Sequence, residues 1–480
     1  MNNFLLGIDL GTTGCKSMVF DMDGNVLGKS YIEYELIFTP EGVEQDAELW
    51  WKYVCSTVRE ASAQANVPIT ALSVSTQGIA GVPVDEGGKP LMNALSWLDC
   101  RSTREMEQLV SRYGEEELFC LTGKNPGGYT LPQVMWLKNN RPQLFNAMKS
   151  YLLALDFLML RMTGIALMDY SMACGTMAYN VRERSWIQAI LKETVGEVFA
   201  PIACMGTKVG TLTAKAAQEL GLTVDTIVAL GAQDQKCAAL GAGIGSGIVT
   251  VSLGTSAAIC SLANFPNVDP ERAVTCCGMD DTHWIMETVV ATAGAALKWL
   301  KNTLFPRYSY EDLNIMAQNS RGGANGVLFF PHFTANQSGK AAGTFTGIGL
   351  STTKEDIVRA VMEGIAYVLA AQVKQHERIG NKVREIRLFG GGAASTTWRQ
   401  IISDMTKLPV LLPATHETAC LGAAILAAKG AGMIEDIYHP DKLLKEPACI
   451  TLPNLQQYEK YQVMQQRYDE LNSSVIRNVI

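Results

Sequence analysis

The sequence predicts an α/β protein built from two similar domains, and three observations support this prediction. Short apolar runs rich in β-forming residues alternate with segments of helical spacing through the 480 residues. One strand–turn–strand pattern occurs twice, as LLGIDLGTTGCKSMVF from Leu5 and as IVTVSLGTSAAIC from Ile248. The two Gly-Thr turns lie about half the chain apart, so each opens one half of the sequence.

The first half begins with strands and continues with helices and further strands. An Asp-Gly turn is predicted to join the second and third strands as a hairpin, and Asp46 is a predicted N-cap. The expected elements are strands at Phe4–Asp9, Lys16–Asp21 and Val26–Glu35, a helix over Glu44–Ala65, and strands at Ile69–Gly78, Tyr151–Leu155 and Thr226–Gly231.

The same order restarts after Gly245, which places the predicted domains at residues 1–245 and 246–480. The glycine-rich segment Gly241–Gly247 is interpreted either as a hinge or as tight packing. The second half is expected to contain strands at Ile248–Ser252, Ala257–Leu262 and Glu385–Gly391, and helices at Ala291–Phe305, Asp356–Gly380 and Thr396–Lys407. A further helix over Leu455–Ile476 is expected to cover its own domain or, alternatively, a partner subunit in a homodimer.

Composition indicates a globular protein with a small-molecule partner. Hydrophobic residues make up 48% of the chain and charged residues 18%, and the net charge of −7 comes without a long basic block, which argues against nucleic acid. Twelve cysteines without a CxxC pair or Cys/His cluster predict reduced thiols and a cytoplasmic location. The N-terminus does not resemble a signal peptide, and no apolar run is long enough to predict a membrane span.

The Gly-Thr turns are candidate phosphate-binding loops. A tight turn without bulky side chains exposes backbone N–H groups, and two such turns on facing domains are expected to bind one polyphosphate. Asp9 stands beside the first turn only, where one carboxylate suffices to hold Mg²⁺ through water when phosphates supply other ligands. The alternative is that each turn is an ordinary hairpin turn.

Two further segments are candidates for chemistry. Asp234 follows a predicted strand and opens a helix, a position where backbone amides favour an ionised carboxylate that accepts a proton. The alternative for Asp234 is a simple helix N-cap. Glycines in LFGGGAASTTWRQ let the backbone approach a flat ligand such as adenine, although strand–helix turns often carry glycine for packing alone.

These segments, in this order, resemble the FGGY family of carbohydrate kinases over nearly the whole chain. The most specific match is GTFTGIGLSTTKEDIVRAVMEGIAY, residues Gly343–Tyr367. Other matching segments are GIDLGTT, VEQDAELWW, SWLDCRS, DYSMACGT, GAQDQ, VSLGTS, GGGAASTTWRQ and ETACLGAA. The resemblance implies two ribonuclease H-like domains of the actin/hexokinase type flanking a catalytic cleft, with ATP and Mg²⁺ as cofactors.

The resemblance also implies a role for each matched residue. Asp234 is similar to the catalytic base and Asp9 to the Mg²⁺-associated carboxylate. The implied nucleotide-binding residues are Thr12 and Thr13 in the first phosphate loop, Gly254 and Thr255 in the second, and Gly294, Gly392 and Thr396. The implied sugar-site residues are Gln77, Trp97, Asp99, Arg101, Tyr129, Asp234 and Gln235. For Trp97 the alternative is core packing, and for Asp99 with Arg101 it is a structural ion pair.

Departures from the family pattern leave the sugar open. Ile79 stands where xylulose kinases usually carry histidine, Gln133 replaces a lysine, and the segment His332–Phe345 lacks the usual Glu-Arg-x-Pro and Trp-Asp motifs. The expected activity is ATP-dependent phosphorylation of a terminal hydroxyl of a ketopentose such as D-xylulose, with ribulose, a tetritol or pentitol, or a sugar acid as alternatives. Two other classes are an actin-like ATPase without a sugar substrate and a sugar-binding regulator that has lost catalysis.

Overall fold

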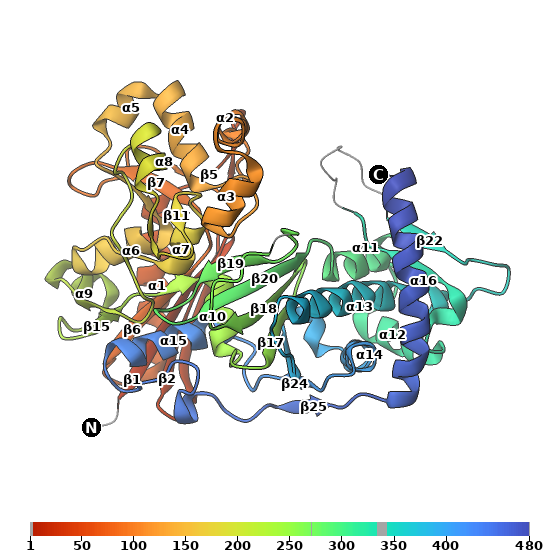
Figure 1. Cartoon of the computed structure of the whole chain (residues 1–480). Helices are drawn as coiled ribbons and strands as arrows, with labels where there is room; N and C mark the ends of the chain where they lie inside the picture. The colour runs from red at the N-terminus through yellow and green to blue at the C-terminus, as the bar shows by residue number, and fades with distance from the viewer. Residues whose placement is uncertain (1–2, 270, 334–342, 480) are drawn as a thin grey trace. The chain divides into compact units, whose positions relative to one another are not determined.

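The computed structural model describes residues 3–269, 271–333 and 343–479 (Figure 1). Residues 334–342, which belong to the segment His332–Phe345 that departs from the family pattern, therefore lie outside the described residues. The chain divides into two compact units, the first formed by Met1–Gly243, Ala263–Met286 and Glu417–Lys445, and the second by Ile244–Leu262, Glu287–His416 and Glu446–Ile480. These units group residues by contact rather than by chain order, and the predicted domain boundary at Gly245 stays a prediction.

The first unit is built on a seven-stranded sheet. Its order is β14-β15-β6-β1-β2-β3, with β16 pairing β6. The strands are β1 (Phe4–Leu10), β2 (Gly14–Asp21), β3 (Val26–Glu33), β6 (Ala71–Thr76), β14 (Lys208–Thr211), β15 (Ile227–Ala229) and β16 (Ala232–Gln233). β1 and β2 are antiparallel, β1, β6, β15 and β16 run parallel, and β14 is antiparallel to β15.

The sheet of the second unit repeats this topology. Five consecutive strands of this seven-stranded sheet are β17 (Ile248–Leu253), β18 (Ala257–Ala263), β23 (Glu385–Phe389), β24 (Val410–Leu412) and β25 (Cys449–Thr451), in the order β18-β17-β23-β24-β25. The directions along it are antiparallel, parallel, parallel and antiparallel, as along β2-β1-β6-β15-β14. The predicted α/β class with two similar sheet-containing halves is confirmed.

Helices of the first unit pack closely on its sheet. Asp46 caps α1 (Ala47–Ala65), as predicted, by accepting from the backbone N–H of Glu48 at 2.8 Å. α15 (Thr418–Gly430) contacts β1, β6 and α10 (Asp234–Gly241). A Cβ added to Gly241 would lie 1.9 Å from the carbonyl oxygen of Thr418, so Gly241 serves tight helix packing rather than a hinge.

A smaller sheet, β4-β5-β8-β7-β9, also belongs to the first unit. Its strands are β4 (Ile37–Phe38), β5 (Val43–Gln45), β7 (Gly81–Val84), β8 (Ala94–Leu95) and β9 (Ser150–Leu153). The strand predicted to extend to Leu155 ends at Leu153, because the carboxylate of Asp156 accepts from the Leu153 N–H at 2.9 Å and starts a helix at Ala154.

The remaining elements complete the two units. The helices are α2 (Thr103–Tyr113), α3 (Glu115–Thr122), α4 (Thr130–Asn140), α5 (Pro142–Ala147), α6 (Ala154–Thr163), α7 (Tyr170–Cys174), α8 (Gln188–Glu193), α9 (Ala214–Leu220), α11 (Gly294–Leu304), α12 (Tyr310–Asn319), α13 (Lys354–Arg378), α14 (Thr396–Thr406) and α16 (Leu455–Val479). The remaining strands are β10 (Met168–Asp169), β11 (Tyr179–Asn180), β12 (Ser185–Trp186), β13 (Ile202–Ala203), β19 (Thr275–Gly278), β20 (Trp284–Val290), β21 (Leu328–Phe330) and β22 (Thr344–Thr346).

The C-terminal helix α16 covers its own unit, beside α13 and α14 (Figure 1). Its Tyr461 and Tyr468 are almost fully buried, and both rings pack against Tyr367 of α13. The Tyr461 hydroxyl donates to the Glu363 carboxylate at 2.6 Å. The helix was predicted to cover either its own domain or a partner subunit, and its buried face covers its own unit.

Two further structural findings bear on the composition. None of the twelve cysteines forms a disulfide. Within the described ranges, no helix is both long enough and apolar enough to cross a bilayer.

The second unit buries a histidine on α13. His376 is fully buried, with Nδ1 2.6 Å from the Ser261 hydroxyl and Nε2 3.2 Å from that of Thr288. Burial lowers the pKa of His376 to about 4, against a smaller opposite effect of Glu287. The imidazole is therefore neutral in the folded protein at pH values where it is protonated in the unfolded chain.

We expect the free energy of unfolding to fall as the pH drops from about 6.5 towards 4, because the unfolded chain then binds a proton that the folded protein does not. Between pH 7 and pH 5 the His376 contribution amounts to about 2 kcal/mol. Urea unfolding of wild type and His376→Asn at both pH values measures it. Since asparagine does not titrate, the stability of the variant should lack this part of the decline, and equal declines in both proteins would contradict the assignment.

Candidate active site

Three parallel strands of the first unit end side by side and bring polar residues together. Asp9 on β1 is in register with Ser75 on β6, and Ala232 on β16 is in register with the same Ser75. The Ser75 hydroxyl donates to Asp9 Oδ1 at 2.7 Å. Asp234 follows β16 directly, so both predicted carboxylates lie at the carboxyl edge of this sheet, where α/β proteins commonly bind ligands.

Asp9 has the chemistry of a ligand for a hard cation. Burial raises the pKa of Asp9, while the Ser75 hydrogen bond and the charge of Lys16 lower it. Among the described residues, Oδ2 takes part in no hydrogen bond, and no cluster of three or more His, Cys, Asp or Glu is arranged to bind a metal. A single carboxylate with a free oxygen fits Mg²⁺, which keeps most of its water and takes other ligands from phosphates.

The turn between β1 and β2 is held by side chains from elsewhere in the first unit. Gly11 N–H donates to the Gly14 carbonyl at 2.9 Å, and the Tyr34 hydroxyl donates to the Gly11 carbonyl. The indole of Trp97 donates to the Thr12 hydroxyl at 2.9 Å. The adjacent Thr13 side chain is exposed, which leaves the tip of the turn accessible to a ligand.

Two buried glutamines connect this turn to the end of β6. Gln45 donates through Nε2 to the Thr12 carbonyl at 2.9 Å and accepts from Gln77 Nε2 at 2.8 Å. The remaining amide oxygen of Gln77, Oε1, is buried without a hydrogen-bond partner. The predicted residues Gln77, Thr12 and Trp97 thus belong to one hydrogen-bonded group.

Trp97 is not a core residue, because 45% of its surface is exposed. The sequence left two interpretations for Asp99 and Arg101, a structural ion pair or direct sugar contact, and the structure contains the ion pair. Arg101 Nη2 lies 2.9 Å from Asp99 Oδ2 and 2.9 Å from Glu44 Oε1. Both side chains are almost fully buried. Asp99 Oδ2 also accepts from the Val43 N–H at 2.8 Å, so this carboxylate joins the loop after β8 to the start of β5.

Asp234 occupies the first turn of α10 rather than the N-cap, which is Gln233. Its Oδ1 accepts from Gln233 Nε2 at 2.5 Å and from the Gln235 N–H at 2.7 Å. These donors stabilise the ionised carboxylate, the form that accepts a proton. The structure therefore excludes the N-cap alternative for Asp234.

Ile79, in the loop after Gln77, lies against Gly175, the residue that follows α7. Ile79 has a left-handed backbone (φ +53°), which is strained for a β-branched residue. A Cβ on Gly175 would lie 2.3 Å from Ile79 Cγ2, and the Gly175 carbonyl accepts from the Thr130 N–H at 3.5 Å. Tyr129 immediately precedes this contact, so the structure brings Tyr129 and Ile79 into one region.

The second unit contains its own loop at the end of β17. The backbone of Gly294 donates to the Gly254 carbonyl at 2.8 Å, and those of Ala293 and Ala295 donate to the Thr255 carbonyl at 3.0 and 3.1 Å. A Cβ on Gly294 would lie 2.5 Å from the Gly254 carbonyl oxygen. The predicted residues Gly254, Thr255 and Gly294 thus form one compact backbone loop at the start of α11.

The glycine-rich segment after β23 lies next to the end of β17. A Cβ on Gly392 would lie 2.6 Å from Leu253 Cγ, and Gly390 adopts a φ of +87° against the Leu253 backbone. Ser395 caps α14 by accepting from the Trp398 N–H at 3.0 Å, which leaves Thr396 exposed in the first turn. Gly392 therefore lies beside the strand end that carries the Gly254 loop, and Thr396 follows it in the first turn of α14.

Comparison with known proteins shows which family this chain belongs to. Residues 4–241 match the N-terminal domain and residues 249–431 the C-terminal domain of the FGGY family of carbohydrate kinases. The xylulose kinase of Staphylococcus epidermidis is 31% identical, with 97% of this chain and 96% of that protein covered. The chain belongs to the FGGY family of carbohydrate kinases. Members of this family use ATP to phosphorylate sugars, so this protein is a sugar kinase.

Solved structures of related kinases have the same fold. Gluconate kinase from Lactobacillus acidophilus superposes with a TM-score of 0.93 at 23% identity, covering 100% of this chain and 99% of that one. Xylulose kinase from the same organism gives 0.92 at 24% identity, with 99% of both chains covered. The implied actin/hexokinase-type fold is confirmed.

Three polar residues of this sugar kinase were not singled out by sequence reasoning. Ser75 hydrogen-bonds Asp9, Gln45 joins Gln77 to Thr12, and Gln233 hydrogen-bonds Asp234. Each lies inside a motif or strand that the sequence analysis named. The partners of Ser75 and Gln45 are far away in sequence, and the sequence does not show which way the Gln233 side chain points. Their hydrogen bonds to predicted site residues are visible only in the folded structure.

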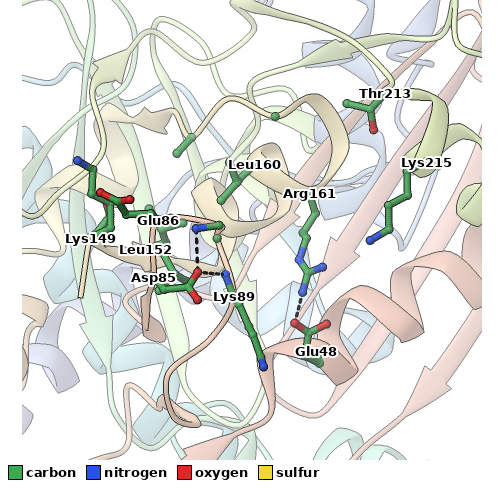
Figure 2. A pocket seen from close by; sticks show the side chains of 16 residues that line it. Glu48, Asp85, Glu86, Lys89, Lys149, Leu152, Leu160, Arg161, Thr213 and Lys215 are labelled. Atoms are coloured by element: carbon green, nitrogen blue, oxygen red, sulfur yellow. Dashed lines mark hydrogen bonds and ion pairs between the residues drawn. The ribbon is translucent and has the colours of Figure 1, made fainter. Parts of the chain in front are cut away.

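A separate pocket of the first unit has a volume of about 560 Å³ and is lined by charges of both signs (Figure 2). Arg161 of α6 forms an ion pair with Glu48 of α1, and Lys89, Lys149 and Lys215 also line the pocket. None of the predicted site residues lines it. It is therefore distinct from the candidate active site.

The Asp99–Arg101 pair should matter more for stability than for sugar contact. We expect Arg101→Met to lower the free energy of unfolding by about 3–5 kcal/mol, because it leaves the buried Asp99 carboxylate without its cation. Arg141→Met is the matched control, since Arg141 also lies over the Trp136 ring but pairs with Glu41 at an exposed position. In the same chemical denaturation experiment, the free energy of unfolding of Arg141→Met should fall by less than about 1 kcal/mol. Unchanged stability of Arg101→Met with a raised KM for sugar would instead support direct sugar contact.

Proposed function

We propose that this kinase transfers the γ-phosphoryl group of ATP to a terminal hydroxyl of a ketopentose, with D-xylulose as the first candidate. The observation that carries the proposal is the placement of Asp9 and Asp234 at the carboxyl ends of β1 and β16, the two parallel strands that pair with β6. Two carboxylates in different settings permit two roles, one for a cation and one for a proton.

Asp234 is the proposed general base. As the sugar oxygen forms its bond to the γ-phosphorus, the bond from that phosphorus to the β–γ bridging oxygen breaks and ADP leaves. The hydroxyl proton passes to the Asp234 carboxylate, whose Oδ1 is held by Gln233 and the Gln235 backbone. Positioning of the hydroxyl and stabilisation of charge contribute most of the rate enhancement in such transfers.

The nucleotide is assigned to the backbone loops. Thr12 and Thr13 of the first unit, and Gly254 and Thr255 of the second, are the proposed phosphate contacts, because each pair lies in the tight turn that follows a strand. Gly294, Gly392 and Thr396 complete the proposed nucleotide-binding residues. Asp9 is the proposed residue that holds Mg²⁺, which when bound neutralises phosphate charge.

Sugar contacts are assigned to the first unit. Gln77, Trp97, Tyr129 and Gln235 are the proposed substrate residues beside Asp234, and Asp99 with Arg101 supports the loop that carries Trp97. The similarity to a xylulose kinase over the full chain supports a ketopentose. Ile79 reshapes this region, which keeps ribulose, a tetritol or pentitol, and a sugar acid as the alternative substrates. A cytoplasmic location is also proposed, supported by the free thiols.

A coupled ADP-release assay with Mg-ATP tests the proposed substrate. The panel contains D-xylulose, ribulose, tetritols, pentitols, gluconate and aldoses. We expect D-xylulose to give the highest kcat/KM and ATP hydrolysis without sugar to be nearly absent. Preference for a sugar acid or polyol would overturn the ketopentose assignment, and steady sugar-independent hydrolysis would favour an actin-like ATPase.

The base assignment predicts that Asp234→Asn loses at least about 100-fold in kcat, because the amide no longer accepts the hydroxyl proton. Asp225→Asn is the matched control, since Asp225 is an exposed carboxylate elsewhere in the first unit, and its kcat should match that of wild type. Thermal melting of both variants verifies folding. Turnover by Asp234→Asn within a few-fold of wild type would exclude Asp234 as the base.

A further inference from the structure

Gln233, the residue before the proposed base, has an amide group in which the nitrogen is hydrogen-bonded and the oxygen is not. Its Nε2 donates to Asp234 Oδ1 at 2.5 Å. Its amide oxygen, Oε1, is buried and has no hydrogen-bond partner. Buried polar atoms without partners are uncommon in folded proteins, and one beside a reacting group indicates a place for a ligand.

The orientation of this amide is determined by chemistry. An ionised carboxylate only accepts hydrogen bonds, so the Gln233 group that faces Asp234 must be the NH₂. The oxygen is therefore the atom left over, and it can only accept. A ligand that satisfies it has to donate, as a hydroxyl does and as a carbonyl or carboxylate does not.

The surroundings place this oxygen in the sugar region of the first unit. Gln233 is in register with Thr76 at the end of β6. A Cβ on Gly78 would lie 3.3 Å from both Cγ and Nε2 of Gln233, so the side chain packs over the backbone that follows Gln77. The next residue is Ile79, whose apolar side chain provides no hydrogen bond where relatives usually carry histidine.

The backbone of Gln233 is anchored independently of its side chain. Its N–H donates to the Ser171 hydroxyl at 2.9 Å. Ser171 lies at the start of α7, where the buried carboxylate of Asp169 accepts from the Ser171 and Met172 N–H groups at 2.8 and 3.1 Å. This arrangement holds the strand end, while the Gln233 amide itself is hydrogen-bonded to Asp234 and packs over Gly78.

We infer that Gln233 is a specificity-determining residue whose Oε1 accepts a hydrogen bond from the substrate hydroxyl next to the one that is phosphorylated. The inference rests on the proposed function, in which Asp234 binds the reacting hydroxyl. Because Nε2 and Oε1 belong to one amide, the carboxylate and the free oxygen present two neighbouring acceptors. Two adjacent hydroxyl groups match them, so the kinase requires a vicinal diol at the reacting end of its substrate. It rejects an oxo group on the carbon next to the one that bears the reacting hydroxyl.

The experiment is a double-mutant cycle between protein and substrate. Steady-state kinetics compare wild type and Gln233→Met, a variant of similar length without donor or acceptor, using the best sugar of the panel and its analogue that lacks the hydroxyl adjacent to the phosphorylated one. Gln218→Met, at an exposed position of α9, is the matched control and should behave as wild type with both sugars.

We expect wild type to lose 10- to 100-fold in kcat/KM on the deoxy analogue, and Gln233→Met to lose a similar factor on the intact sugar. On the deoxy analogue the variant should lose at most a further three-fold, because the contact is already absent. Gln233→Glu retains an acceptor oxygen, so it should still prefer the intact sugar even though its kcat falls. It serves as the second variant if Gln233→Met melts at a lower temperature.

Independent losses would overturn the inference: if Gln233→Met discriminates between intact and deoxy sugars as strongly as wild type, Gln233 does not contact that hydroxyl. Equal use of both sugars by wild type would overturn it as well. Failure of the proposed function is separate, since it appears as full activity of Asp234→Asn or as absence of sugar-dependent turnover in wild type.

Discussion

The parallel pairing of β1 with β6, and of β6 with β16, is the constraint on which the candidate site depends. Its register sets Asp9 beside Ser75 and ends β16 where α10 begins, so residues far apart in sequence meet at one sheet edge. A slip of one residue would turn each of these side chains to the opposite face of the sheet. Both faces of β1 and β6 are buried, so a slip would exchange the side chains packed on the two faces. It would also place a larger residue where Gly7 packs against the Cys420 carbonyl of α15. The packing on both faces of the sheet thus also positions the carboxylates.

Close packing behind the sheet fixes the helix that carries Asp234. α10 and α15 approach until a Cβ on Gly241 or Gly422 would lie 1.9 Å from a carbonyl oxygen of the other helix. The same helix α15 reaches β1, where a Cβ on Gly7 would lie 1.9 Å from the Cys420 carbonyl. Larger residues at these positions would push α10 or β1 away. Small residues in these elements therefore serve the geometry of the site, although none of them touches it.

The second unit applies the same topology to a different task. Its hairpin β17–β18 and parallel neighbour β23 repeat β1–β2 and β6, yet its loop contains no aspartate and is closed by Gly294 and the backbone of α11. One arrangement of strands thus yields a loop with a carboxylate and a loop of backbone groups alone. Because strand ends impose backbone geometry rather than side-chain identity, such a repeat can diverge in chemistry while its fold is kept.

The sequence by itself determined the fold class, the two similar halves, most of the long helices and strands, and the motifs that place the chain among sugar kinases. These features follow from local periodicity, capping and residue order, which are properties of neighbouring residues. Only the tertiary structure decided that Asp99 and Arg101 form a buried pair, that Trp97 is exposed beside Thr12, and that Asp234 is not an N-cap. It also showed Ser75, Gln45 and the free amide oxygen of Gln233. The physical reason is that hydrogen-bond partners and burial depend on strand register and on contacts between distant segments, which a pattern of nearest neighbours does not contain.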